Sequence, residues 1–131
     1  MSRTITVLGT LLVLAVVLGY TFWHLVNKSV SADLSVIGQG KPVAVLVYEN
    51  YSPTSMEHLE RINAVRDDLE GEIVFRVATI GSPEGDRFIA RYDAPRGALL
   101  VLDGEGALLA GLGMPGEAEE LARRLREALE D

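Results

Sequence analysis

The chain opens with an apolar run that is long enough to cross a membrane. Residues 5–26 are 22 positions without a charged side chain, mainly Leu, Val and Ile. As an α-helix such a run is about 33 Å long, and the hydrocarbon core of a bilayer is roughly 30 Å thick. Tyr20, Phe22 and Trp23 lie towards its end, where aromatic rings favour the headgroup region. We therefore expect residues 1–28 to form an N-terminal transmembrane helix.

A cleaved signal peptide is the alternative interpretation of this run. The apolar part of a signal peptide has about 7–15 residues and is followed by small residues at the cleavage site. Small residues occur at positions 29–32, so that cleavage after Ser31 or Ala32 stays open. The run is longer than a signal peptide needs, which favours an uncleaved anchor. A lipid-anchored form is excluded, because that anchor is attached to a cysteine and the chain has none.

Beyond residue 40 the pattern changes to short apolar runs that alternate with amphipathic stretches. Continuous apolar runs predict strands at 43–48, 73–78 and 97–102, and the Asp103–Gly104 turn signal predicts a hairpin to a fourth strand at 107–112. Apolar residues three or four apart predict helices at 53–69, 84–92 and 117–130. In the first of these helices the expected buried stripe is Met56, Leu59, Ile62, Val65 and Leu69.

The order of these elements predicts the fold class. It is β-α-β-α-β-β-α, in which the first strands are parallel and the closing hairpin adds antiparallel strands to the same sheet. We expect an α/β protein with an N-terminal transmembrane helix (1–28), a linker (29–40) and one domain (41–131). The linker mixes Ser, Asp and Gly, with a turn or short strand expected at 34–37.

The junction between the first strand and the first helix of the domain resembles the active-site turn of the thioredoxins. In that family Trp-Cys-x-x-Cys opens the helix, and here the sequence is Tyr51-Ser52-Pro53-Thr54-Ser55. Together with the order of elements, the resemblance covers about 90 residues from Lys41 to the end. It implies a thioredoxin-like β-α-β-α-β-β-α domain.

The resemblance also implies where the thiol chemistry of that family would lie, and the chain departs from it at each position. Both cysteine positions are serines, Ser52 and Ser55. The carboxylate that many of these enzymes bury in the preceding strand falls on Leu46, and their cis-proline falls on Gly97 or Ala98. A serine hydroxyl forms no thiolate and no disulfide. We therefore predict that the chain is not a thiol–disulfide oxidoreductase, and not an enzyme.

Other chemistry has little support in the sequence. Ser55 and His58 are three residues apart and could touch on a helix, but a serine nucleophile also needs an orienting acid and an oxyanion hole. His24, at the end of the span, could ligate a haem or chlorophyll, although an interfacial histidine more often meets water or headgroups. Two histidines and no cysteine give no metal-ligand cluster. We expect no cofactor, no metal and no small-molecule substrate.

The distribution of charge indicates which partners to expect. After Lys28 there are 19 acidic and 10 basic residues, a net charge of −9. Nucleic acid would be repelled, and so would an anionic membrane surface, which favours a stalk over a domain that lies flat on the bilayer. A short head before a single span most often stays in the cytoplasm. We therefore expect a single-pass protein of a bacterial inner membrane with its C-terminal domain in the periplasm.

Two sets of residues are candidates for contact with partners. At the domain surface they are Tyr51, Ser52 and Pro53, and Arg96, Gly97 and Ala98 of the loop expected to face them. In the span, Ala15 and Gly19 form a small-xxx-small pair, followed by Trp23, and such pairs allow helices to pack closely.

Three functions stay open at this point. The favoured one is an accessory or scaffolding subunit of a larger membrane protein complex, in contact with other membrane protein subunits and with the lipid bilayer. The second is a membrane-tethered module that binds peptides or acts as a chaperone. The third is a decayed oxidoreductase of the cytochrome-maturation type, whose layout of anchor and domain matches this chain.

Overall fold

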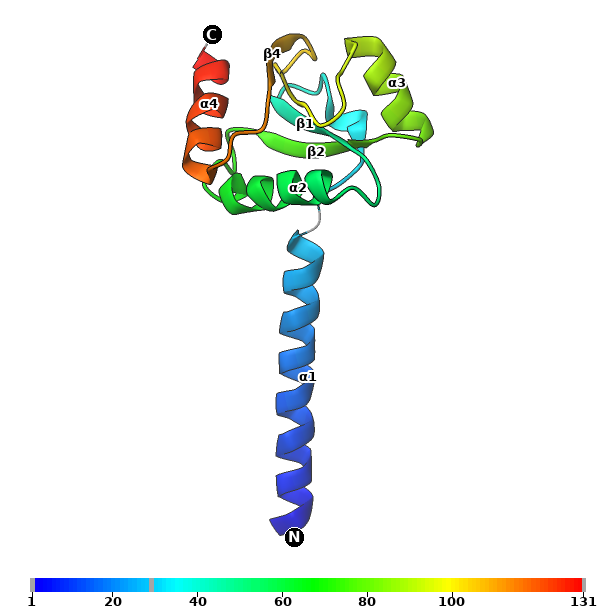
Figure 1. The fold of residues 1–131 in the computed structure, drawn as a ribbon. Helices are drawn as coiled ribbons and strands as arrows, with labels where there is room; N and C mark the ends of the chain where they lie inside the picture. Colours follow the sequence, from blue (N-terminus) through cyan, green and yellow to red (C-terminus); the bar gives the residue numbers. More distant parts are fainter. Residues whose placement is uncertain (1, 29, 131) are drawn as a thin grey trace.

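The computed structural model describes residues 2–28 and 30–130, without the side chains of residues 23–28. Helix α1 (Ser2–Lys28) extends away from a domain that is built on a sheet (Figure 1). The side chains of Ser2–Phe22 are exposed, and this stretch is long and apolar enough to cross a membrane. The candidate span is therefore not a core helix of the domain.

Four strands form the sheet, in the spatial order β2-β1-β3-β4. Their bounds are Val43–Tyr48 (β1), Val74–Thr79 (β2), Leu99–Leu102 (β3) and Leu108–Leu112 (β4). Strand β1 pairs with β2 in parallel and with β3 antiparallel, and β3 and β4 form the closing hairpin. This is the predicted mixed α/β arrangement, with β1 in the interior of the sheet.

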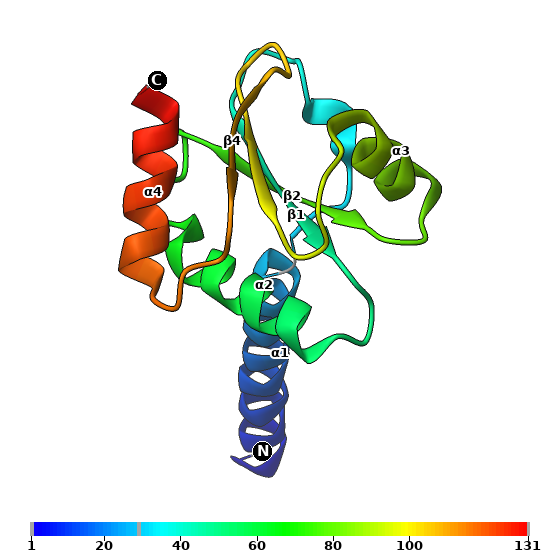
Figure 2. The same ribbon diagram turned by 45° about the horizontal axis from the view of Figure 1, so that its top comes forward.

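Helices cover both faces of the sheet. On one face, α2 (Pro53–Arg66) and α4 (Ala118–Glu130) pack over a core that includes Leu46, Ile62 and Leu125. On the other face lie α3 (Pro83–Tyr92) and the short 3-10 helix η1 (Leu34–Val36) (Figure 2). They enclose a second core that includes Val45, Val47 and Phe88. Successive residues of β1 therefore enter different cores, which is why the whole strand is apolar.

The predicted stripe of α2 is wrong at its first position. Met56 is 54% exposed, whereas Ser55 is only 3% exposed. Ser55 lies seven residues, or two helical turns, before the buried Ile62 and therefore shares its face of the helix. Met56 lies about 100° further round the helix. The helix also ends at Arg66 rather than at 69, and Leu69 is buried in the turn that follows. The other elements begin and end within two residues of their predicted bounds.

The segment expected as a linker lies against the domain. Val30 packs on the core beneath α2, and Leu34, Val36 and Ile37 pack on the opposite core. The Val77 N–H donates to the Ser31 carbonyl (3.0 Å), which joins this segment to the outer edge of β2. Only one residue, position 29, separates the end of α1 from the first residue that packs on the domain. The domain is therefore held very close to the end of α1.

Candidate functional site

The turn between β1 and α2 is organised as the beginning of a helix. Ser52 is the N-cap of α2, in an extended conformation, and its Oγ accepts from the Ser55 N–H at 3.3 Å. Pro53 follows at the first helical position, where its missing N–H leaves no partner unsatisfied. The Ser52 hydroxyl thus satisfies a backbone group of the first helical turn.

Ser55 is the buried polar side chain of this turn. Its Oγ accepts from the Glu49 N–H at 3.1 Å, so it joins α2 to the chain leaving β1. Its partner is a part-buried backbone amide, for which the loss of the acceptor costs free energy. The two serines at the positions where the resemblance to thioredoxins implies cysteines therefore accept hydrogen bonds from backbone N–H groups, one from within α2 and one across the turn.

The loop at 95–98 is fixed beside this turn. The Gly97 N–H donates to the Val47 carbonyl (3.2 Å) and the Val47 N–H donates to the Ala98 carbonyl (2.9 Å), which extends the pairing of β1 with the chain entering β3. Arg96 Nη1 lies 3.3 Å from Glu49 Oε1 across the two loops. This ion pair is exposed and contributes little to the free energy of folding, but it links the turn before α2 to the 95–98 loop.

His58 lies beneath the 95–98 loop, on the second turn of α2. A Cβ added to Gly97 would lie 3.6 Å from His58 Cε1, and Gly97 has a left-handed φ of 79°. Burial, and then the positive charge of Arg61, lower the pKa of His58, with weaker opposition from Glu57 and from the Gly97 backbone. Its Nδ1 is buried and has no hydrogen-bond partner among the described residues. The contact of His58 with Gly97 packs the loop on the helix.

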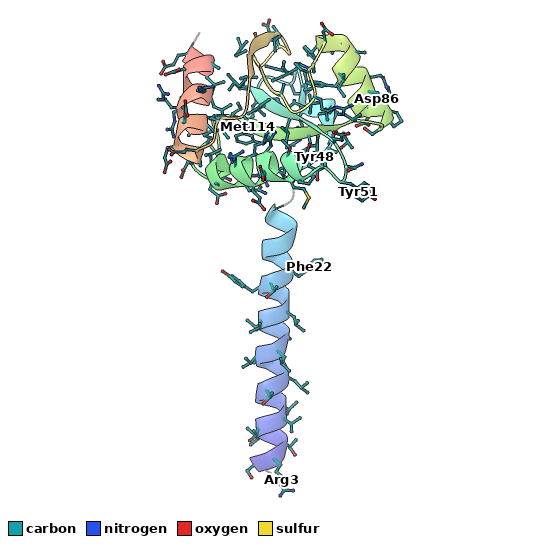
Figure 3. The ribbon with its side chains drawn as sticks, viewed as in Figure 1. Arg3, Phe22, Tyr48, Tyr51, Asp86 and Met114 are labelled. Atoms are coloured by element: carbon teal, nitrogen blue, oxygen red, sulfur yellow. The ribbon has the colours of Figure 1, made fainter. Side chains whose placement is uncertain are left out.

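Tyr51 stands apart from these contacts. Its side chain is 99% exposed, and its φ of 64° is left-handed, a conformation that residues other than glycine adopt at a cost of about 1 kcal/mol or more. Among the described residues, Asp93 is the other non-glycine residue with a positive φ. Figure 3 shows Tyr51 projecting from the domain at the side from which α1 leaves. The chain therefore holds this aromatic ring in solvent at an energetic cost.

The structure brings together most of the sequence-predicted surface residues. Tyr51, Ser52 and Pro53 lie at the start of α2, and Arg96 is joined to the same turn through Glu49. On the far side of the 95–98 loop is an open depression of about 300 Å³, lined by the loop and by residues 111–113 of β4 and its end. Whether these residues bind a partner stays a prediction.

The residues predicted for packing within the membrane lie on α1. Ala15 and Gly19 are exposed, and no atom lies within 4 Å of a Cβ added to Gly19. The side chains of Trp23 and His24, including the possible ligation by His24, lie outside the described residues. The packing of this face against another helix stays a prediction.

Sequence reasoning missed two features of the site. The sequence signal for the buried position of Ser55 is its spacing of seven to Ile62, and the weak amphipathic pattern of α2 does not favour it over the apolar Met56. The pairing of Glu49 with Arg96 had no signal in the sequence, because the two residues are 47 positions apart and meet only through the sheet.

Comparisons with known proteins identify the fold. No protein-family model and no curated protein matches the chain. Among solved structures, an uncharacterised thioredoxin-like protein from Clostridium perfringens is similar with a TM-score of 0.66 at 17% identity, over 77% of this chain and 82% of that one.

A thioredoxin from Thermus thermophilus is also similar, with a TM-score of 0.56 at 20% identity, over 67% of this chain and 73% of that one. The DsbH oxidoreductase is similar with a TM-score of 0.57 at 16% identity, over 70% of this chain and 74% of that one. Identities of this size support the fold and not the activity. The chain therefore has a thioredoxin-like domain behind an apolar N-terminal helix, and it has no Cys-x-x-Cys motif.

Proposed function

We propose that this protein is a non-catalytic, single-span accessory or scaffolding subunit of a larger membrane protein complex. Its thioredoxin-like domain would dock on an exposed face of the complex, on the periplasmic side of a bacterial inner membrane. The observation that carries the proposal is the use of the two serines. Ser52 caps α2 and Ser55 binds the Glu49 amide, so the positions of the family's thiols have structural roles here.

Two further features support the same role. Leu46, at the position of the family's buried carboxylate, is fully buried in the core between β1 and α2. The apolar side chains of α1 face outwards along Ser2–Phe22, which suits contact with lipid and with other transmembrane helices. The thioredoxin-like fold without its thiols then supplies a rigid body for protein contacts.

The experiment is purification of the tagged full chain from its native membranes in mild detergent. We expect other membrane subunits to co-purify in a fixed stoichiometry. Ala15→Leu with Gly19→Leu should weaken that association at least tenfold, because larger side chains hold helices apart. Val13→Leu with Val17→Leu puts the same two leucine side chains on the opposite face of α1 and is the control for the position of the change. A chain that purifies alone as a monomer would contradict the proposal.

The side of the membrane on which the domain lies can be measured separately by cysteine labelling. The chain has no cysteine of its own, so an introduced thiol is the single reactive site. Glu105→Cys introduces a single thiol at the exposed hairpin between β3 and β4. A maleimide that does not cross the inner membrane should label it in spheroplasts. Labelling only after lysis would place the domain in the cytoplasm.

A membrane-tethered peptide-binding or chaperone-like module is the second candidate. It is favoured by the exposed Tyr51 ring and the depression beside Arg96, Gly97 and Ala98. Titration of the full chain in micelles with unfolded peptides should then shift the NMR signals of Tyr51 and Ala98. Shifts in neither residue at saturating peptide would exclude this function.

A further inference from the structure

We propose that Tyr51 and Met56, the exposed apolar tip at the start of α2, insert into the interfacial layer of the bilayer that α1 crosses. The inference rests on the membrane-anchored state of the proposed function and adds a lipid contact for the domain itself. The occupant is the zwitterionic headgroup region, and not a peptide.

The short connection between α1 and the domain brings this tip to the membrane. Helix α1 ends at Lys28, and Val30 is already packed on the core beneath α2. Two residue steps extend at most about 7 Å. The headgroup region on each side of a bilayer is roughly 5–8 Å thick. With Lys28 at the level of the headgroups, this tether keeps the face of the domain nearest α1 within about 7 Å of them.

The turn before α2 is the part of the domain that lies near the tether. Asn50 and Ala32, two residues beyond Val30, line the same hollow. Figures 1 and 3 show α2 on the side of the domain that faces α1, with Tyr51 at its edge. The face nearest the bilayer therefore includes the first turn of α2.

The side chains of this turn suit an interface between water and lipid. Tyr51, directly before the N-cap of α2, is 99% exposed, and Met56, in the first turn of α2, is 54% exposed. Tyrosine is enriched at membrane interfaces, where its ring is partly desolvated and its hydroxyl stays hydrated. A lipid contact would offset both the exposure of the ring and its left-handed backbone.

Charge limits the contact to the tip. Positions 51–56 carry no charged side chain, whereas Glu57 and Glu60 follow on exposed positions of α2. Together with the net charge of −9 after Lys28, they keep the rest of the helix away from anionic lipid. The tip therefore enters a zwitterionic surface while the domain as a whole stays upright.

The test uses the full chain in phosphatidylcholine vesicles, with Trp23→Phe to remove the single native tryptophan. Tyr51→Trp then reports the position of the tip, and this exposed site tolerates the change without repacking. Leu108→Trp is the matched control, because Leu108 is 49% exposed at the start of β4, near the hairpin that lies far from α1 in Figure 1. Emission is measured with and without lipids that carry a nitroxide on the headgroup.

We expect headgroup nitroxides to quench Tyr51→Trp at least twofold more strongly than Leu108→Trp, with acrylamide from the aqueous phase showing the reverse order. Equal quenching of the two variants would overturn the inference, even where the chain resists alkaline extraction from the vesicles. Release of the chain by alkaline extraction would instead contradict the membrane-anchored state, and with it the premise of the proposed function.

Discussion

Helix α1 and strand β1 are both uninterrupted apolar runs, yet the structure treats their side chains in opposite ways. Leu14, in the middle of α1, is 52% exposed, and its neighbours along Ile5–Phe22 are similarly exposed. Val43 to Val47 of β1 are completely buried. The apolar surface of β1 is covered by the protein, whereas that of α1 along Ser2–Phe22 is left uncovered by the domain, as a membrane span would be.

The difference lies in the length of each run and in what surrounds it. Five of the six residues of β1 are buried between β2, β3 and the helices on both faces of the sheet. The 27 residues of α1 satisfy their own backbone hydrogen bonds and have no apolar partner in the domain along Ser2–Phe22. A self-sufficient backbone is the requirement for a segment in lipid. The hydrophobicity of a run therefore does not by itself tell whether the run is buried in a protein core or exposed along a helix that could cross a membrane.

A charge placed in each run should separate the two regions most clearly. Leu46→Asp buries an unpaired carboxylate in β1, at a cost of several kcal/mol, which is comparable to the total stability of a small domain. We expect the domain to unfold, as measured by circular dichroism of the chain in micelles. Leu14→Asp should leave the melting temperature of the domain unchanged, and reduce the fraction that resists alkaline extraction. A lower melting temperature for Leu14→Asp would show that α1 packs on the domain.

Hydroxyl groups offer a finer comparison of the same two regions. Ser55→Ala leaves the part-buried Glu49 N–H without its acceptor, and we expect a loss of about 1–3 kcal/mol in the free energy of unfolding. Thr10→Ala removes a hydroxyl that bonds only to the Thr6 carbonyl of its own helix, so domain stability should not change. Ser52→Ala should lie between them, at about 1 kcal/mol for a lost N-cap. Denaturant titration in micelles gives all three values.

The smallest expected effect is a dependence of domain stability on pH. The pKa of His58 is lowered in the folded state, mainly by burial, so the unfolded chain binds the proton more readily. The contribution of neutral His58 to domain stability is complete above the pKa of the unfolded chain, about 6.5. It is lost as the pH falls through the lower pKa of the folded state. The pKa of Asp33 is also lowered in the folded state, from an ordinary value of 3.8. Its protonation therefore also reduces stability as the pH falls, but only below about that value.

Melting temperatures between pH 7 and pH 5 therefore isolate the histidine. We expect a decrease that His58→Gln removes and that His24→Gln, on α1, preserves. A slope that persists in His58→Gln would mean that other groups cause it.

The regular elements could be predicted from sequence because each depends on local pattern. The apolar run of β1, the turn at Asp103–Gly104 and the spacing of Leu121 and Leu125 in α4 each specify one element. Contacts between distant segments could not be predicted in this way. The ion pair of Glu49 with Arg96 depends on the register of β1 with β3, and the packing of Val30 depends on the finished core.

The candidate site shows the same division. Ser52 was recognisable as an N-cap from its place before Pro53. The burial of Ser55 in place of Met56 required the rotation of α2 to be known, which its weak amphipathic pattern did not fix. The left-handed backbone of Tyr51 had no signal, since tyrosine rarely adopts that conformation.

In the membrane-anchored state proposed above, the single residue between α1 and Val30 also limits how far from the bilayer the domain reaches. A domain of this size is roughly 35 Å across. With so short a tether it sweeps a shallow layer by lateral diffusion instead of searching a volume. Any protein that it meets must therefore present its binding surface within about one domain height of the bilayer, which selects membrane neighbours over freely diffusing ones.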